Sequence, residues 1–173
     1  MLRGLLLFYK RKKGAMAMDI RSAKEALLVA CQMETEAVQT YRRAMQLMDQ
    51  LGRRQEALYG HLCAILRDEE SHLARFRTLA EALPEEIPPE RLLTLGAMQQ
   101  GTLFENGLMG AARQGFLEDV PGMLRYAAKS EALSVERYQA FAKLAQTPDA
   151  REALLQIAAE EARHLSELEA LEK

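Results

Sequence analysis

Two of the three histidines in this 173-residue sequence follow a glutamate at a spacing of three residues: Glu69 precedes His72, and Glu161 precedes His164. In a helix, residues three apart lie on the same face, so each pair would direct a carboxylate and an imidazole to one place. Carboxylate oxygens combined with an imidazole suit iron or manganese. Each pair could therefore supply part of a metal site.

Two more glutamates begin a repeated pattern. Glu34 is followed seven residues later by Tyr41, and Glu131 is followed seven residues later by Tyr138. Each tyrosine would lie two helical turns beyond its glutamate on the same face, where its phenol could hydrogen-bond a carboxylate ligand from a neighbouring helix. Packing in the core is the alternative role for these two tyrosines.

The order of these segments divides the sequence into two related halves, each with a glutamate-tyrosine segment followed by a glutamate-histidine segment. Four helices would then bring six ligands to one point in a bundle core. We expect the metal ligands to be Glu34, Glu69, His72, Glu131, Glu161 and His164. This set favours two iron ions, with manganese or a mixed pair of metals as the alternative.

The expected arrangement has two bridging glutamates, Glu69 and Glu161, with one ion completed by Glu34 and His72 and the other by Glu131 and His164. Two alternatives stay open at this point. Asp68 and Glu160 stand four residues before the same histidines, a spacing that also places two side chains on one face. The acidic and imidazole side chains could instead form solvated ion pairs in a bundle that binds no metal.

Apolar residues recur with a helical period in four long segments that carry these six residues. Ser22 and Glu25 form a capping box at the start of the first segment, and Thr147 is placed to cap the last. Pro121 and Pro148 are typical first-turn prolines. We expect helices over about residues 20–51, from near Arg53 to Pro84, from Pro121 to about Gln146, and from Pro148 nearly to Lys173.

Residues 83–120 differ from these segments because prolines and glycines interrupt their pattern, with helical pieces expected near 90–99 and 102–114. The first two helices share a short link and should be antiparallel, whereas residues 83–120 form a long connection. A chain of this length suits one domain. The predicted fold is therefore all-α, a four-helix bundle with a long, partly helical crossover between the second and third helices.

The charge is unevenly distributed along the chain, whose formal net charge is −2. Residues 1–17 contain no acidic residue and carry Arg3, Lys10, Arg11, Lys12 and Lys13. We expect a basic N-terminal extension outside the core over residues 1–19 and a metal-binding domain over residues 20–173. Because the remainder of the chain is acidic, nucleic acid is not an expected partner.

The apolar run Leu5–Tyr9 is too short to span a bilayer, so no membrane-spanning segment is expected. A weak membrane-surface or partner-docking tail is the alternative role of residues 1–17. The two cysteines, Cys31 and Cys63, fall within helical patterns and form no CxxC motif. Neither a disulfide framework nor a thiolate metal site is indicated, and a cytoplasmic location is the expectation.

Taken together, these motifs resemble the rubrerythrin branch of the ferritin-like superfamily. The matching segments are Glu34-x-x-Ala37-x-x-x-Tyr41, Glu69-Glu-Ser-His72, Glu131 with Tyr138, and Ile157-Ala-Ala-Glu-Glu161-Ala-Arg-His164, and the resemblance covers most of residues 20–172. It implies a ferritin-like bundle with a non-haem di-iron centre that reduces hydrogen peroxide, or reacts with oxygen, in defence against oxidative stress. It also implies a homodimer.

The sequence departs from rubrerythrins at two points. It lacks the four cysteines of their rubredoxin-like module, so we expect an external electron donor such as a rubredoxin-type protein. Ser134 stands where rubrerythrins have an additional glutamate. The six-ligand set that is left also resembles that of bacterioferritins, which makes a ferroxidase or another iron-handling protein an alternative.

The first two helices also resemble those of demethoxyubiquinone hydroxylases, which are membrane-associated di-iron monooxygenases. The segments concerned are Glu34-x-x-Ala-Val-x-x-Tyr-Arg and Glu69-x-x-His-Leu-x-x-Phe. Polar residues between positions 96 and 115 make a poor membrane surface, whereas an apolar and exposed crossover would favour the hydroxylase. A structural or interaction bundle is the non-enzyme alternative.

Overall fold

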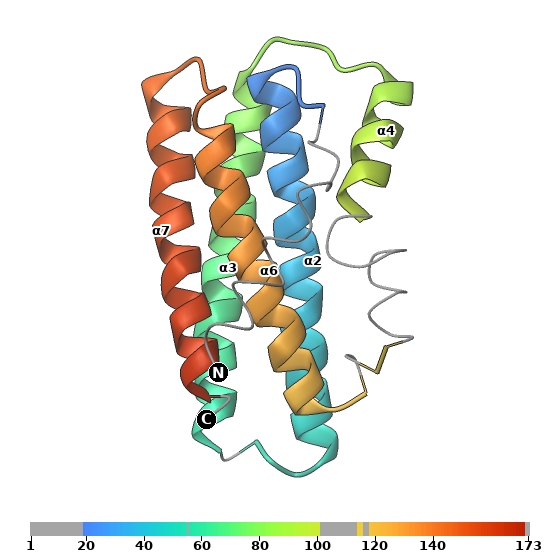
Figure 1. Ribbon diagram of the computed structural model, residues 1–173, viewed down its shortest axis with the longest axis vertical. Helices are drawn as coiled ribbons and strands as arrows, with labels where there is room; N and C mark the ends of the chain where they lie inside the picture. Colours follow the sequence, from blue (N-terminus) through green and yellow to red (C-terminus); the bar gives the residue numbers. More distant parts are fainter. Residues whose placement is uncertain (1–18, 55, 101–113, 116–117, 172–173) are drawn as a thin grey trace, which may run out of the picture.

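Four long helices lie around a common core, and a shorter helix packs outside them against one side (Figure 1). The computed structural model describes residues 19–54, 56–100, 114–115 and 118–171. The helices of these residues are, in chain order, α2 (Ala23–Gln50), α3 (Ala57–Ala82), α4 (Pro89–Gln100), α6 (Val120–Phe141) and α7 (Pro148–Leu171). The predicted all-α bundle is confirmed.

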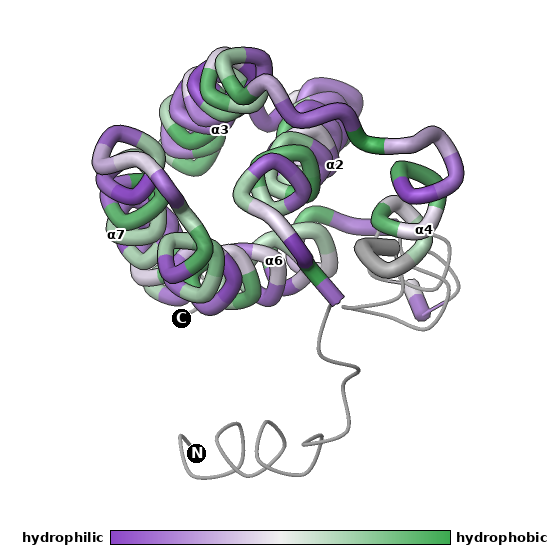
Figure 2. Tube along the Cα trace, turned by 90° about the horizontal axis from the view of Figure 1, so that it is seen from above, coloured by the Kyte–Doolittle hydropathy of each residue, from purple (hydrophilic) through white to green (hydrophobic). Residues whose placement is uncertain are grey.

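The four long helices form two antiparallel hairpins, α2 with α3 and α6 with α7. Seen from above, the hairpins close a ring in which α2 lies beside α6 and α3 beside α7, and α4 lies outside the ring next to α2 (Figure 2). No helix in the described ranges is both long and apolar enough to cross a membrane.

Three of the long helices begin at side-chain caps. The Ser22 hydroxyl accepts the backbone N–H of Glu25 at 3.2 Å, as the capping box predicts. Asp119 accepts the N–H of Gly122 at 2.6 Å before α6, and Thr147 accepts the N–H of Ala150 at 3.3 Å before α7. The predicted first-turn prolines, Pro121 and Pro148, lie at the starts of α6 and α7.

The second long helix starts later than predicted, at Ala57 rather than near Arg53. Gly52 has φ of +70°, and the N–H groups of Gly52 and Arg53 bond the carbonyls of Asp49 and Met48 at 3.1 and 2.9 Å. These bonds form a Schellman motif, in which a glycine in the left-handed region ends a helix. Arg53 therefore lies in the turn that ends α2 and not in α3.

The third long helix ends earlier than predicted, at Phe141 rather than about Gln146. Lys143 and Leu144 donate backbone hydrogen bonds to the carbonyls of Ala140 and Phe141 at 3.1 and 2.9 Å, so the chain leaves the helix through tight turns. The predicted helix near residues 90–99 is confirmed as α4. The one predicted near 102–114 lies outside the described residues, except for position 114.

The core of the bundle consists of two apolar clusters separated along the helix axes. One cluster contains residues from the early part of α2, the late part of α3 and the early part of α7, among them Ala30, Phe76 and Leu154. The other contains the late part of α2 and the early part of α3, including Met48 and Leu62. In every long helix a buried glutamate lies between the two clusters, so the fold contains a polar layer between two apolar layers.

A buried ion pair holds α4 to the start of α2. The Arg91 guanidinium donates to both Glu25 carboxylate oxygens, at 2.6 and 2.7 Å, and to the carbonyl oxygen of Asp19. The side chains of Arg91 and Glu25 are only 11% and 5% exposed. Leu95 of α4 is buried in the apolar cluster that contains Ala30. Both charged and apolar contacts thus hold α4 against the bundle.

We expect the Glu25→Ala variant to lose about 2 kcal/mol of unfolding free energy, because it removes the carboxylate that accepts two hydrogen bonds from Arg91 and leaves only Asp19 beside this charge. Urea denaturation of the metal-free protein measures this loss. Glu56→Ala is the matched control, since Glu56 pairs with Arg53 at 2.6 Å on the surface, where an ion pair contributes at most about 1 kcal/mol. Equal losses in both variants would contradict the role of the Arg91 pair.

Candidate metal centre

All six predicted ligands meet in the polar layer of the bundle. Each is buried, with at most 3% of its surface exposed. Glu34 comes from α2, Glu131 from α6, and each glutamate-histidine pair from α3 or α7. Their burial contradicts the alternative of solvated ion pairs, because no water-exposed position is available to these carboxylates.

The six side chains form two groups that share two carboxylates. One group is Glu34, Glu69, His72 and Glu161, called the His72 site below. The other is Glu69, Glu131, Glu161 and His164, called the His164 site. Within each group, the potential ligand atoms all lie within 4.8 Å of one another. Each site thus has three carboxylates and one imidazole, a donor set that suits iron or manganese.

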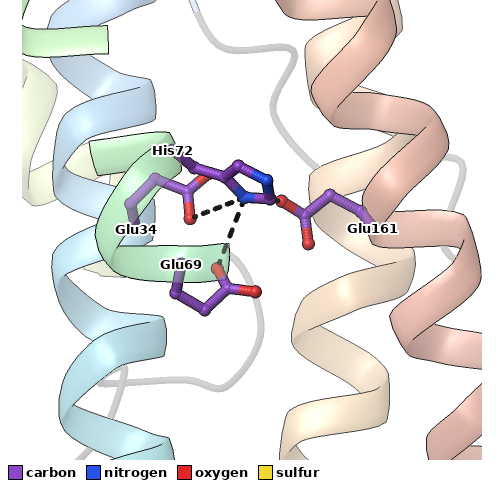
Figure 3. Close-up of side chains that lie close together, drawn as sticks. All are labelled: Glu34, Glu69, His72 and Glu161. Atoms are coloured by element: carbon purple, nitrogen blue, oxygen red, sulfur yellow. Dashed lines mark ion pairs between the residues drawn. The ribbon is translucent and has the colours of Figure 1, made fainter. Parts of the chain in front are cut away.

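The Nδ1 atoms of both histidines point into this cluster. Nδ1 of His72 lies 3.0 Å from Oε1 of Glu161 and 3.9 Å from an oxygen of Glu34 and of Glu69 (Figure 3). Nδ1 of His164 lies 3.0 Å from Oε1 of Glu69 and 3.4 Å from Oε2 of Glu161.

Despite these short distances, five buried atoms of the cluster have no hydrogen-bond partner: Oε1 of Glu69, both carboxylate oxygens of Glu161, and Nδ1 of His72 and of His164. These atoms face one another without the alignment of donor and acceptor. Buried polar atoms of native proteins are otherwise almost always paired. The arrangement fits side chains that surround a shared cation, so the residues present are suited to a metal.

The other ring nitrogen of each histidine contacts a carboxylate from the opposite helix. Nε2 of His72 lies 2.7 Å from Glu160 of α7, and Nε2 of His164 lies 3.1 Å from Asp68 of α3. A carboxylate on one ring nitrogen fixes the proton there and leaves the lone pair of Nδ1 for a metal.

These contacts exclude the alternative ligand pairs, Asp68 with His72 and Glu160 with His164. Each acid instead lies behind the histidine of the other hairpin and is partly exposed, by 39% for Asp68 and 33% for Glu160. Sequence analysis missed this orienting role. Its signal was an acidic residue directly before the glutamate in both glutamate-histidine segments.

The two buried tyrosines connect the hairpins through the remaining glutamates. The Tyr138 hydroxyl donates to Oε1 of Glu34 at 2.5 Å, and the Tyr41 hydroxyl donates to Oε1 of Glu131. Burial and the nearby glutamate charges raise the pKa of both phenols well above the usual range, so both keep their protons at neutral pH. Each phenol thereby orients one carboxylate of the cluster.

We expect the Tyr138→Phe variant to bind Mn²⁺ at the His72 site about 10-fold or more weakly, because Glu34 loses the hydrogen bond that orients it. The phenyl ring retains the packing against Phe76, whose centroid lies 5.1 Å away. Calorimetric titration measures the change. Tyr59→Phe, at the far end of the bundle beside Arg54, is the control. An unchanged affinity would leave only a packing role for Tyr138.

Burial changes the proton affinity of the carboxyl groups in the cluster. Burial and the charges of Glu161 and Glu69 raise the pKa of Glu34 and of Glu131 well above the usual range. Burial also acts to raise the pKa of Glu161, but contacts with Glu131 and with the two histidines outweigh it, and the pKa lies below the usual range.

The histidines bind protons more tightly than free imidazole does. Burial acts to lower the pKa of His164, but contacts with Glu161 and Glu69 outweigh it and raise the pKa to about 10. The pKa of His72 is raised for the same reason, with Glu161 as the main partner. Two divalent cations or four protons would neutralise the four buried carboxylates, so metal ions and protons compete for this cluster.

Fold and site together define a helical bundle with a buried carboxylate-histidine cluster that could bind metal. Residues 22–173 match the family model of the ferritin-like domain, and the chain belongs to this family. Comparisons with curated proteins and with solved structures gave no match. The predicted relation to the ferritin-like superfamily is thus confirmed.

Proposed function

We propose that this protein is a non-haem di-iron oxidoreductase of the rubrerythrin type, which reduces hydrogen peroxide with electrons from an external donor. The supporting observation is the pair of overlapping four-residue sites that share Glu69 and Glu161. Shared carboxylates keep two ions close together, as a two-electron reaction at a pair of one-electron metals requires. Oxygen is the alternative oxidant.

Two bound iron(II) ions would supply one electron each, which, with two protons, convert hydrogen peroxide to two molecules of water. The protein holds the reacting pair and excludes water from it. Glu69 and Glu161 lie between the sites, while Glu160 and Asp68 orient the histidines. The tyrosines hold Glu34 and Glu131 as terminal carboxylates.

The proposal includes an external electron donor, because the two cysteines of this sequence cannot form a four-cysteine iron site. A rubredoxin-type donor is therefore part of the proposal, as are a homodimeric assembly and a cytoplasmic location. Hydrogen peroxide or oxygen is the expected small-molecule partner.

Metal analysis followed by anaerobic peroxide titration tests the proposal. We expect about two iron ions per chain in protein from iron-supplied cells. One equivalent of peroxide per reduced centre should oxidise both irons, as followed by optical spectroscopy and by iron(II) chelation of the quenched sample. Loss of only one iron(II), or none, would reject the assignment as a two-electron peroxidase.

A ferroxidase or iron-handling protein is the second candidate, and the buried Ser134 favours it. Ser134 is 7% exposed and lies one helical turn beyond Glu131 on α6, at the position where rubrerythrins, which the sequence resembles, have an additional glutamate. Repeated addition of iron(II) in air separates the two functions. Continued iron uptake beyond the two sites indicates storage, whereas donor-dependent peroxide turnover at constant iron content indicates catalysis.

The hydroxylase alternative depends on an apolar crossover. In the described part of the crossover, α4 exposes Leu92 by 44% and Leu93 by 77%. The polar residues expected to oppose membrane contact lie largely beyond α4 and outside the described residues. Flotation of the protein with liposomes tests this alternative, and the peroxidase proposal expects no flotation.

A further inference from the structure

The two metal sites are alike in their ligands but differ in the charges behind their histidines. At the His72 site, Glu160 contacts Nε2 of His72 at 2.7 Å and accepts a hydrogen bond from the neutral amide of Gln156 at 3.1 Å. The nearest cation in this chain of contacts is Arg75, which donates to the side-chain amide oxygen of Gln156 at 2.9 Å. An uncharged group therefore separates Arg75 from Glu160.

At the His164 site, a cation contacts the orienting carboxylate directly. Arg163 donates to Oδ2 of Asp68 at 2.8 Å, and that same oxygen lies 3.1 Å from Nε2 of His164. The Arg163 nitrogen is itself 3.4 Å from Nε2 of His164. Arg163 also pairs with Glu167 at 3.1 Å. A guanidinium group thus shares the oxygen that orients the metal-facing imidazole.

The internal repeat of the sequence shows where this difference arises. Alignment of the two halves pairs His72 with His164, and it pairs the preceding residues, Ser71 and Arg163. Ser71 is exposed on α3 and carries no charge. The duplicated hairpins have therefore kept the same ligands but differ in charge at the position directly before each histidine.

A carboxylate behind a metal-binding imidazole increases the basicity of the ring and strengthens metal binding. A cation on that carboxylate draws its charge away from the imidazole and also repels a divalent ion. The contact of Arg163 should therefore weaken the His164 site, while the His72 site keeps the full effect of Glu160.

We propose that Arg163 makes the two metal positions unequal, so that the His72 site holds a divalent cation more tightly than the His164 site. This inference rests on the proposed function only in requiring that both sites bind metal. Arg163 acts through Asp68, as a positioning residue. The His164 site is then the position that fills last and releases its ion first.

Single-site variants test the order of affinities without repulsion between two bound ions. Glu131→Gln removes a ligand unique to the His164 site, and Glu34→Gln removes the equivalent ligand of the His72 site. Titration of each metal-free variant with Mn²⁺ gives one dissociation constant. The Glu34→Gln protein retains the His164 site, and the Glu131→Gln protein retains the His72 site. We expect the Glu34→Gln protein to bind Mn²⁺ about tenfold more weakly than the Glu131→Gln protein.

Adding Arg163→Gln identifies the cause of the difference. It should tighten Mn²⁺ binding about tenfold in the Glu34→Gln protein and change it less than about twofold in the Glu131→Gln protein. Ser71→Arg places a cation at the equivalent position, and it should weaken binding in the Glu131→Gln protein. The control is Arg42→Gln, because Arg42 is similarly exposed and pairs with Glu70 at 2.5 Å on the surface.

Equal dissociation constants in the two single-site variants would overturn the inference. An equal effect of Arg163→Gln in both backgrounds would also overturn it, because that result indicates a general electrostatic field. If the single-site variants do not bind Mn²⁺, Arg163→Gln is tested alone in the otherwise unchanged protein. There it must bring the dissociation constants of the two Mn²⁺ binding steps closer together. Absence of any Mn²⁺ binding by that protein would instead refute the proposed metal centre.

Discussion

In the Glu69→Gln variant we expect both metal ions to be lost together, because Glu69 belongs to the His72 site and to the His164 site. Glutamine has nearly the same shape but no charge, and its amide cannot replace a bridging carboxylate. The affinity for Mn²⁺ should fall at least about 100-fold at both sites. This is more than the loss of affinity expected when a residue that only hydrogen-bonds a metal ligand is removed. Peroxide-dependent oxidation of added iron should disappear with it.

Glu70→Gln is the matched control for this variant. Glu70 is the next residue on α3, but its side chain is 45% exposed and pairs with Arg42. The Glu70→Gln protein should have the same metal content as the unchanged protein. Because Glu69 lies 3.0 Å from Nδ1 of His164, its replacement should itself lower the stability of the metal-free protein. Urea denaturation of the metal-free proteins therefore separates loss of metal from loss of folding. Retention of one tightly bound ion by Glu69→Gln would contradict the bridging role.

The second large effect concerns pH and the stability of the metal-free protein. The raised pKa values of His72 and His164 mean that their protons stabilise the folded state fully below the unfolded pKa near 6.5. This contribution is lost as the pH rises toward about 10 for His164. The raised pKa values of Glu34 and Glu131 have the same effect. Their contribution to the stability of the folded state is lost as the pH rises above the unfolded value of 4.5.

The shift in the pKa of Glu161 has the opposite effect on the pH dependence of stability. This pKa is lowered by the fold, so the contribution of Glu161 is present above the unfolded value of 4.5 and is lost as the pH falls below it. The metal-free protein should therefore be most stable in mildly acidic solution, because Glu161 loses its contribution below pH 4.5 while Glu34 and Glu131 lose theirs above it. Its Tm should fall steadily from about pH 6.5 to pH 9.

Metal binding should reverse this decline, because ions replace the protons of the cluster. If both sites are occupied at 100 times their dissociation constants, binding contributes about 5 kcal/mol. For a chain of this size that raises the Tm by about 10–20 °C. The increase should be larger at pH 8 than at pH 6, and titration should show proton release as Mn²⁺ binds.

Thermal denaturation followed by circular dichroism, with chelator or with Mn²⁺ across this pH range, measures both effects. The Glu69→Gln protein provides the control, because Mn²⁺ should hardly raise its Tm. A Tm of the metal-free protein that increases from pH 6.5 to pH 9 would contradict the expected protonation of the cluster.

Local spacing in the sequence determined which side chains share a helix face. Glu69 and His72 are three residues apart, so any helix through them directs both side chains the same way. The same reasoning applies to Glu34 and Tyr41, and the repeat of both patterns indicated four helices around one centre. Caps such as Ser22 also depend on neighbouring residues alone, and α2 begins directly after this residue.

Helix ends that depend on chain reversal were less predictable. The helical pattern of the second segment begins near Arg53, and that of the third continues beyond Phe141, but the chain must turn at both places for the hairpins to pack. At the first of these positions, backbone bonds around Gly52 end α2 and delay the start of α3. Periodicity carries no information about where such a turn falls.

Contacts between helices were decided only by the tertiary structure. Asp68 and Glu160 each lie on the same helix as one histidine but contact the histidine of the other hairpin. The position of α4 likewise depends on the pairing of Arg91 with Glu25, which are 66 residues apart. Spacing along one helix specifies which direction a side chain points, whereas its partner is set by the neighbouring helix that packing brings opposite it.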